Sequence, residues 1–259
     1  MEARKELFLQ ERHQEILRLL GETRRVSVLE LSKHFGVSGV TIRSDLQALA
    51  QKNLLVRTHG GAVPTNRGLH DLSLSLRIQL QMREKQKIGQ IGAARVADGD
   101  AIFLDTSSTT LAIARNLKNH RHVTVITNSL AVAQELLDAQ GVTVVMPGGK
   151  LRTETASLVG TAGLEMLRKI NIQKGFFGAH GITVADGLTD VSTDEADVKR
   201  PLIAVCRQVI AVLDATKWGK VGLVPFASLQ EIDEIITDKA APAELVEQVQ
   251  SLGIRIELI

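Results

Sequence analysis

The 259-residue sequence contains a single cysteine, Cys206, one tryptophan and no tyrosine. One cysteine excludes an internal disulfide framework and fits a reducing compartment. The seven histidines and this cysteine lack the spacing of metal ligands, so no metal site and no cofactor are predicted. No apolar run approaches the roughly 20 residues of a membrane span, and the polar start MEARKELFLQER is not a signal peptide. We therefore expect a cytoplasmic protein without a membrane partner.

Charge is distributed unevenly along the chain. Residues 1–62 contain 10 Lys and Arg against 7 Asp and Glu, a net charge of +3, whereas residues 63–259 carry a net −1. Such a mild excess gives one protomer little nonspecific affinity for nucleic acid. We therefore expect a homodimer or homotetramer, in which phosphate contacts are multiplied. The length allows a small module and a second domain with a sizeable core.

The first 36 residues carry start and stop signals for two helices. The first helix is predicted to end at Gly21, and its apolar stripe consists of Leu9, Ile16 and Leu20. Ser27 and Glu30 have the spacing of a capping box, which predicts the start of a second helix. Gly36 is predicted to end that helix, since a glycine accepts the conformation that follows a last turn.

The stretch VSGVTIRSDLQAL, residues 37–49, predicts a third helix with two different faces. Ser38 is expected to cap this helix by accepting the backbone N–H of Thr41. At 100° per residue, one face is apolar and is expected to be buried: it consists of Ile42, Leu46 and Leu49. The opposite face consists of Val40, Arg43, Ser44 and Gln47. For this stretch alone, an ordinary solvated helix face is the alternative.

LLVRTHGGAV, residues 54–63, predicts two short strands joined at His59, Gly60 and Gly61. Paired glycines accept the positive φ that a tight hairpin requires. Three helices and a hairpin in about 60 residues form a winged helix-turn-helix, in which the second helix of the pair enters the major groove. Arg57 and His59 lie on the predicted wing, where they suit phosphate or minor-groove contacts. A solvated strand position is the alternative for Arg57.

The outward face of the third helix suits the base edges of double-stranded DNA. Arg43 can donate to guanine O6 and N7, and Gln47 can pair with adenine N6 and N7. Ser44 can donate or accept, and Val40 can lie against a thymine methyl group. The predicted DNA contacts are Ser38, Val40, Thr41, Arg43, Ser44, Gln47, Arg57 and His59.

A polar stretch follows the wing and indicates a domain boundary. This stretch, PTNRGLH at residues 64–70, contains Pro64, Asn66 and Gly68. We expect a DNA-binding domain at residues 1–63, a connecting segment at 64–84 and a larger domain at 85–259. Residues 72–100 have apolar positions at helical spacing and predict one or two helices. These helices pack either between protomers or on their own domain.

From residue 101, short runs rich in Val and Ile alternate with helical stretches. The runs are AIFL, VTVI, VTVVM, VIAVL and IRIEL, and segments such as LAIARNLKN and LAVAQELLDA separate them. This alternation is typical of an α/β domain with a mostly parallel sheet covered by helices. In such sheets ligands bind beyond the carboxyl ends of the strands.

Polar residues follow several of these predicted strands. AIFL runs into Asp105, Thr106, Ser107, Ser108, Thr109 and Thr110. Hydroxyl and N–H groups at a helix N-terminus suit an anion, most naturally a phosphate, although such a run can also simply cap a helix. Other predicted strand ends carry Asn128, Gly148, Gly149, Asp214 and Lys217. The strand ends together predict a small, anionic, hydroxylated ligand.

These segments together resemble the DeoR family of bacterial transcriptional repressors. The resemblance covers nearly the entire chain, through TIRSDL, LVRTHGGAV, DTSSTT, TNS, PGG, FFGAHGIT, GLTD and DATKWG. It implies a winged helix-turn-helix joined to a larger α/β sensor domain that is similar to ribose-5-phosphate isomerase. It also implies a repressor of a sugar catabolic operon, which a phosphorylated sugar effector releases from double-stranded operator DNA.

The resemblance also implies which residues of this chain form the two binding sites. The recognition helix corresponds to Val40 to Leu49. The implied effector site consists of Asp105, Ser107, Ser108, Thr109, Thr110, Asn128, Gly148, Gly149 and Lys217. Further candidates for its rim are Lys85, Arg152, Gly181, Asp194, Glu195 and Lys199. Two positions depart from the family pattern, because Ser44 stands where many members have a second arginine and Ser107 stands where many have a glycine.

Two other functions use the same residues. A sugar-phosphate isomerase is one alternative, with Asp194, Glu195 and Lys199 as acid–base groups. An isomerase does not need the N-terminal module, and similarity of fold does not transfer activity, so we do not expect an enzyme. The second alternative is an activator, which makes the same contacts with DNA and effector as a repressor.

Overall fold

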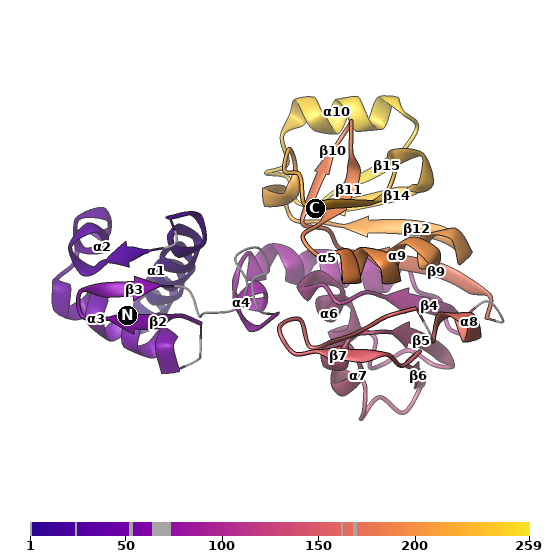
Figure 1. Cartoon of the computed structure of the whole chain (residues 1–259), viewed down its shortest axis with the longest axis horizontal. Helices are drawn as coiled ribbons and strands as arrows, with labels where there is room; N and C mark the ends of the chain where they lie inside the picture. Colours follow the sequence, from indigo (N-terminus) through magenta and orange to yellow (C-terminus); the bar gives the residue numbers. More distant parts are fainter. Residues whose placement is uncertain (1, 24, 52–53, 64–73, 162, 168–169) are drawn as a thin grey trace. The chain divides into compact units, whose positions relative to one another are not determined.

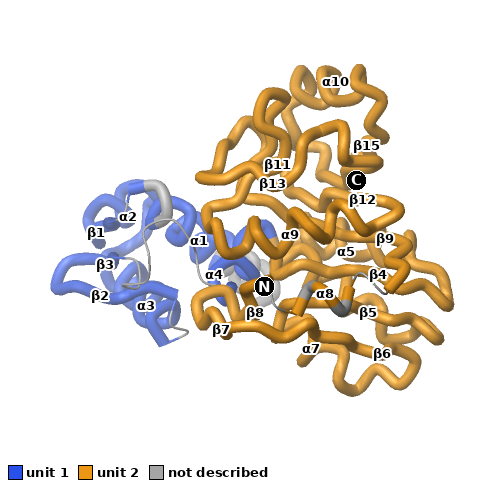
Figure 2. The backbone as a smooth tube through the Cα atoms, turned by 45° about the vertical axis from the view of Figure 1, so that its right-hand side comes forward, with its two compact units in different colours: residues 1–81 blue, residues 82–259 orange. Residues whose placement is uncertain are grey.

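The computed structural model (Figure 1) describes residues 2–23, 25–51, 54–63, 74–161, 163–167 and 170–259. The chain divides into two compact units, residues 1–81 and 82–259 (Figure 2). The predicted boundary residues Pro64, Asn66 and Gly68 lie outside the described residues. None of the helices in these described ranges combines the length and the apolar character that crossing a membrane requires.

In the smaller unit, helices and a three-stranded antiparallel sheet surround one core (Figure 1). The helices are α1 (Glu2–Thr23), α2 (Val28–Phe35), α3 (Gly39–Gln51) and α4 (Leu74–Gln79). The strands β1 (Val26–Ser27), β2 (Val56–Thr58) and β3 (Gly61–Val63) pair in the order β1-β3-β2. The core contains Ile16, Leu17, Leu20, Leu31, Ile42, Leu46 and Leu49. The predicted helix-turn-helix and wing are therefore present.

Side chains cap α2 and α3 as predicted. Ser27 accepts the N–H of Glu30, and the Glu30 carboxylate accepts the N–H of Ser27 in return. Gly36 ends α2 in the left-handed conformation, with φ of 63°. The hydroxyl of Ser38 accepts the N–H of Thr41 at 3.2 Å, which fixes the residue at which α3 begins.

Two local predictions for this unit are wrong. Gly21 lies inside α1, which continues to Thr23, and the Thr23 hydroxyl then donates to a carbonyl of the last turn. Neither Gly60 nor Gly61 has a positive φ. Gly61 is needed for a close approach instead, because a Cβ there would lie 1.9 Å from the carbonyl oxygen of Val26 in β1.

The larger unit is built on a seven-stranded parallel sheet, which confirms the α/β prediction (Figure 1). Five strands correspond to the predicted runs: β4 (Ala101–Leu104), β5 (Val123–Thr127), β6 (Val142–Val145), β12 (Cys206–Val212) and β15 (Arg255–Leu258). Two further strands, β9 (Ile172–Phe177) and β14 (Glu234–Thr237), are absent from the prediction. The strand order is β15-β14-β12-β9-β4-β5-β6.

Helices and smaller strands complete this unit. The helices are α5 (Met82–Ala94), α6 (Ser108–Arg115), α7 (Leu130–Glu135), α8 (Leu164–Leu167), α9 (Thr193–Val205) and α10 (Ala243–Ser251). A hairpin consists of β7 (Lys150–Arg152) and β8 (Ser157–Val159), and an antiparallel sheet consists of β10 (Gly181–Thr183), β11 (Gly187–Asp190) and β13 (Val224–Ala227). Two 3₁₀ turns are η1 (Ala215–Lys217) and η2 (Leu229–Glu231).

The strand order reverses between β4 and β9. From β4 the chain adds β5 and β6 on one side, whereas β9 pairs on the other side of β4 and is followed outward by β12, β14 and β15. In open parallel sheets, ligands bind at this kind of switch point, beyond the carboxyl ends of the strands. The segment after β4, which begins at Asp105, therefore lies at the position in the fold that favours a binding site.

Candidate functional site

The outward face of α3 is exposed as a group. Val40 is 73% exposed, and Arg43, Ser44 and Gln47 are exposed on the same side of the helix. Two other predicted contact residues lie in or next to the first turn: the exposed Ser38 and the partly buried Thr41. A guanidinium, an amide, a hydroxyl and a branched apolar group thus lie side by side, which are the groups that read base edges in a major groove.

Asp45 anchors the opposite face of α3 to α1. The Asp45 carboxylate is almost fully buried and accepts hydrogen bonds from Arg12 at 2.6 and 3.0 Å. His13 Nε2 lies 3.2 Å from the same carboxylate. The hydrogen bond with Asp45 is the largest of the effects that raise the pKa of Arg12 above its ordinary value. These three residues were not predicted from the sequence, because their pairing depends on how two helices cross.

The wing touches the recognition helix. The Arg57 guanidinium, on β2, donates to the amide oxygen of Gln47 on α3. Both residues are exposed, as is His59 in the turn between β2 and β3. Two predicted DNA contacts from different elements therefore form one hydrogen-bonded pair.

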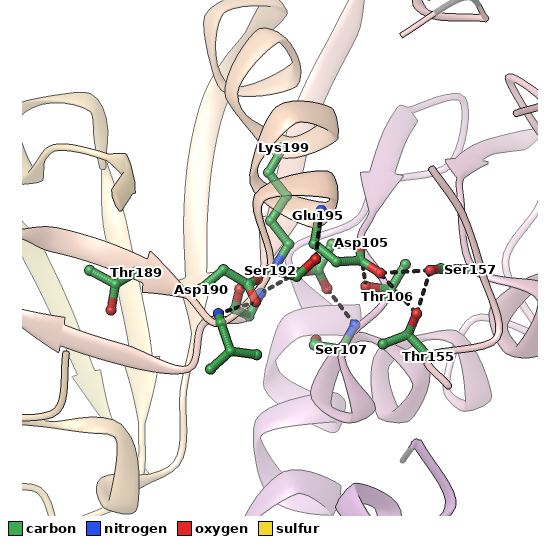
Figure 3. A network of polar contacts seen from close by, with 12 residues as sticks. Asp105, Thr106, Ser107, Thr155, Ser157, Thr189, Asp190, Ser192, Glu195 and Lys199 are labelled. Atoms are coloured by element: carbon green, nitrogen blue, oxygen red, sulfur yellow. Dashed lines mark hydrogen bonds and ion pairs between the residues drawn. The ribbon is translucent and has the colours of Figure 1, made fainter. Parts of the chain in front are cut away.

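In the larger unit, Asp105 joins the two strands of the switch point (Figure 3). Asp105 is fully buried directly after β4, and its Oδ2 accepts the N–H of Gly178, directly after β9, at 2.9 Å. Its Oδ1 accepts the N–H of Ser107 at 2.9 Å and the hydroxyl of Thr110 at 3.0 Å. Both carboxylate oxygens are thus occupied by groups of the protein, and Asp105 fixes the shape of the loop between β4 and α6.

Lys199 is the buried cation of this site. It extends from α9, and its Nζ lies 3.0 Å from Asp105 Oδ2, 2.8 Å from Asp190 Oδ2 and 2.9 Å from the carbonyl oxygen of Gly178. The ring of Phe226 lies 4.7 Å from the same nitrogen. Burial alone would lower the pKa of Lys199, but the charges of Asp105 and Asp190 outweigh burial and raise it. The amine therefore stays protonated at neutral pH.

Glu195 lies one turn before Lys199 and binds hydroxyl groups from two other segments (Figure 3). It accepts from Thr106 at 3.1 Å, from Thr155 at 2.9 Å and from Ser157 at 2.6 Å. Arg152 Nη1 lies 3.9 Å from the same carboxylate. Glu195 thus connects the loop after β4 to the hairpin of β7 and β8. Within the described ranges, no group of three or more His, Cys, Asp or Glu is arranged to hold a metal ion.

The hydroxyl groups after β4 have separate roles. Ser107 caps α6 by accepting the N–H of Thr110 at 3.1 Å, and a Cβ on Gly178 would lie 2.4 Å from the Ser107 Cβ. The Ser107 side chain therefore packs directly on the end of β9. Ser108 and Thr109 are buried in the first turn of α6, where their N–H groups donate to no protein group among the described residues.

The next two strand ends contribute an amide and two glycines. Asn128 is buried after β5 and donates to the carbonyl of Leu158 at 3.1 Å. Its Oδ1 is buried and has no hydrogen-bond donor in the described part of the chain. Gly148 and Gly149 follow β6 with φ of 82° and 132°. A Cβ on Gly149 would lie 2.5 Å from the carbonyl oxygen of Val159, so the segment needs glycine there.

The remaining predicted site residues lie elsewhere in the unit. Lys85 Nζ is 4.0 Å from Asp214 Oδ2, and Asp214 caps the η1 turn that contains Lys217. Because β9 separates β12 from β4, the end of β12 is two strand spacings, about 10 Å, from Asp105. Asp194 is exposed on α9, in contrast to its neighbour Glu195. Gly181 packs on backbone, since a Cβ there would lie 2.0 Å from the carbonyl oxygen of residue 220.

Two domain models of one family match the sequence of this chain. Residues 12–67 match the "DeoR-like helix-turn-helix domain", and residues 80–239 match the "DeoR C terminal sensor domain". The chain belongs to the DeoR family. The smaller unit is thus the DNA-binding helix-turn-helix of a DeoR-family transcriptional regulator, and the larger unit contains its sensor domain.

Relatives in this family align with the chain over most of its length. "Uncharacterized HTH-type transcriptional regulator YgbI" of Escherichia coli is 38% identical over 90% of this chain and 91% of the relative. "HTH-type transcriptional repressor GlcR" of Bacillus subtilis is 36% identical over 90% of each chain. "Glycerol-3-phosphate regulon repressor" of E. coli is 32% identical over 96% of this chain and 98% of the relative.

Solved structures with a related arrangement are more distant. Ribose 5-phosphate isomerase A from Methanocaldococcus jannaschii matches with a TM-score of 0.39 and 17% identity, over 52% of this chain and 53% of the isomerase. The full-length sorbitol operon regulator SorC from Klebsiella pneumoniae matches with a TM-score of 0.36 and 11% identity, over 94% and 98% of the two chains. Similarity at this level does not transfer an activity to the DeoR-family chain.

The geometry of this DeoR-family sensor domain also bears on the acid–base groups considered from the sequence. Lys199 is held protonated by two carboxylates, and Asp194 is exposed and separated from the buried pair. A general acid or base needs a pKa near the working pH and must reach the substrate. The arrangement of Lys199 suits a structural ion pair better than proton transfer.

Proposed function

We propose that this DeoR-family chain represses a sugar catabolic operon and leaves its operator when a phosphorylated sugar binds to the larger unit. The exposed face of α3 carries the proposal, because Val40, Arg43, Ser44 and Gln47 are exposed to solvent and suit base edges. Two relatives, the glycerol-3-phosphate regulon repressor of Escherichia coli and GlcR of Bacillus subtilis, are named as repressors, which supports repression over activation. We propose no enzymatic activity.

The DNA-binding half of the proposal depends on Arg43. Its guanidinium is exposed and donates to no side chain in the described residues, so all of its N–H groups are available to a guanine edge. We predict that Arg43→Ala lowers specific binding by about 1–3 kcal/mol and relaxes the base preference at one position. Fluorescence anisotropy with labelled DNA from upstream of the protein's own gene measures this loss. Equal affinity of the variant and the wild type would remove Arg43 from the interface.

We further propose that the phosphate of the effector binds at the first turn of α6. The N–H groups of Ser108 and Thr109 and the positive end of the helix dipole favour an anion there. The buried amide oxygen of Asn128 needs a donor, and a sugar hydroxyl supplies one. We assign Asp105 an indirect role, because the protein already occupies both of its carboxylate oxygens and the loop takes its shape from them.

The test of the effector half is release of DNA by a sugar phosphate. A panel of phosphorylated sugars is added to the complex of protein and labelled DNA, and the anisotropy is followed. We predict that one of them releases the wild type, whereas Asp105→Ala and the closer mimic Asp105→Asn still bind DNA but are not released, because the loop loses its shape. Arg200→Gln, an exposed substitution on α9, serves as the control. Normal release of both Asp105 variants would exclude this residue from the response.

A further inference from the structure

We propose that Arg57 determines DNA specificity through Gln47, by holding the Gln47 amide so that the pair presents only N–H donors to the base edge. The inference rests on the DNA-binding half of the proposed function. It starts from one contact: the Arg57 guanidinium donates to the amide oxygen of Gln47, ten residues earlier in the chain. The two residues lie on neighbouring elements, α3 and β2, which are side by side in both views of the unit (Figures 1 and 2).

The contact changes what Gln47 offers to DNA. A glutamine reads adenine with both ends of its amide, since Oε1 accepts from N6 and Nε2 donates to N7. In this structure Oε1 already accepts from Arg57, which restrains the amide plane, and the two Nε2 protons donate to no protein group within the described residues. The guanidinium keeps N–H groups of its own beyond the one used. The edge that matches a donor-only pair is guanine, whose N7 and O6 are both acceptors in the major groove.

The surroundings of Arg57 support this assignment. Within the described residues, no carboxylate forms an ion pair with Arg57, and Gln47 is its side-chain partner. A wing arginine that only binds phosphate needs no partner on the recognition helix. Arg43, by contrast, lies on the same exposed face of α3 without a side-chain hydrogen bond among the described residues. Two residues of α3 are therefore expected to contact bases. Arg43 does so independently, whereas the amide of Gln47 is oriented by Arg57 of the wing.

The experiment selects binding sites from a library of randomised DNA duplexes. The wild type, Gln47→Ala, Arg57→Ala and the double variant are each selected and sequenced, and affinities are then measured by anisotropy over a range of salt concentrations. Arg57→Lys, which keeps the positive charge but loses the planar fork, is the matched control for charge. Both residues are exposed, so these substitutions leave the core of the unit intact.

The expected result is a guanine preference of about 5- to 150-fold at one position in the wild type. Gln47→Ala, Arg57→Ala and Arg57→Lys all lose that preference, and the double variant loses no more than either single variant. A pure phosphate contact behaves differently: its removal weakens all sequences equally and lowers the salt slope by about one.

Two outcomes would overturn the inference. One is a uniform loss of affinity in Arg57→Ala while the preference at the Gln47 position persists. The other is selection of adenine at that position by the wild type. If the wild type enriches no sequence over random DNA, the proposed function itself fails, and this result is recognised before any variant is compared.

Discussion

A lysine buried among carboxylates is stable only while its partners remain in place, and Lys199 is such a residue. Its ammonium group faces Asp105 and Asp190 at 3.0 and 2.8 Å in a region closed to solvent. The raised pKa means that the folded state holds this proton more tightly than the unfolded chain does. The resulting stabilisation is complete below the ordinary pKa of 10.5 and is lost only as the pH rises beyond it, so between pH 6 and 9 it is constant.

We predict that Lys199→Met lowers the free energy of unfolding by about 3–5 kcal/mol at pH 7, because two buried carboxylates lose their cation. In the variant, burial raises the pKa of these carboxyl groups, so the folded state binds protons more tightly than the unfolded state. Its stability therefore increases as the pH falls, and the deficit relative to the wild type is smaller at pH 5 than at pH 7.

Urea unfolding of the full chain at the two pH values measures both effects. Lys220→Met, which removes an exposed lysine of the same unit, is expected to stay within about 0.5 kcal/mol of the wild type. A deficit in Lys199→Met that is equal at pH 5 and pH 7 would contradict the assignment of the lost charge to Asp105 and Asp190.

Single residues of the switch-point site differ in how far the sequence alone reveals them. Asp105 is found from its place after the apolar run AIFL, and Glu195 and Lys199 follow from the resemblance to a family. Asp190 ends the GLTD segment that carries the resemblance, yet it was not among the predicted site residues, because nothing in this four-residue antiparallel strand shows that its carboxylate contacts Lys199. Contacts between distant segments decide its role, and a local pattern does not contain them.

At the scale of elements, the strand β9 at the switch point was not predicted from the sequence. The pattern of β9 is interrupted by Lys174, which pairs with Asp100 at 2.5 Å, and by Gln173, which accepts the N–H of Ala101. Its Gly175 lowers strand propensity, yet a Cβ there would lie 2.6 Å from the sulfur of Cys206 on β12. Gln173 and Gly175 thus contact the neighbouring strands β4 and β12, and Lys174 pairs with the residue directly before β4. The strands β5 and β6, on the other side of β4, lack such interruptions and were predicted directly.

The wing supplies a prediction at the same scale, through two adjacent glycines. A Cβ on Gly61 would lie 1.9 Å from the Val26 carbonyl oxygen, whereas a Cβ on Gly60 would meet no atom within 4 Å. Gly61→Ala must therefore push β3 away from β1, which we expect to cost about 1–3 kcal/mol or more and to weaken DNA binding by moving the wing. Gly60→Ala should leave both properties within error of the wild type.

Thermal unfolding and anisotropy, measured side by side on the two alanine variants, check this prediction. Two variants of equal stability and affinity would show that β1 and β3 do not approach as closely as the structure describes. Loss of affinity in Gly60→Ala alone would instead indicate that the turn itself contacts DNA.

At the scale of the whole molecule, two units with separate cores must be coupled if an effector is to release DNA. Coupling is a free energy shared by two binding sites, and it is reciprocal: the factor by which a sugar phosphate weakens operator binding equals the factor by which operator DNA weakens sugar-phosphate binding. Typical couplings of about 1–3 kcal/mol correspond to about 5- to 150-fold.

We therefore predict that saturating operator DNA raises the Kd of the full-length protein for its sugar phosphate by the same factor that anisotropy gives for release. Isothermal titration of the sugar phosphate into free and DNA-bound protein provides the comparison. Arg43→Ala is the matched control, because it is a substitution in the smaller unit that weakens DNA binding, and its sugar-phosphate affinity should equal that of the free wild type. An unchanged Kd in the presence of operator would mean that the sugar phosphate does not release DNA through a linked equilibrium, and the effector half of the proposed function would then be lost while the DNA-binding half remained.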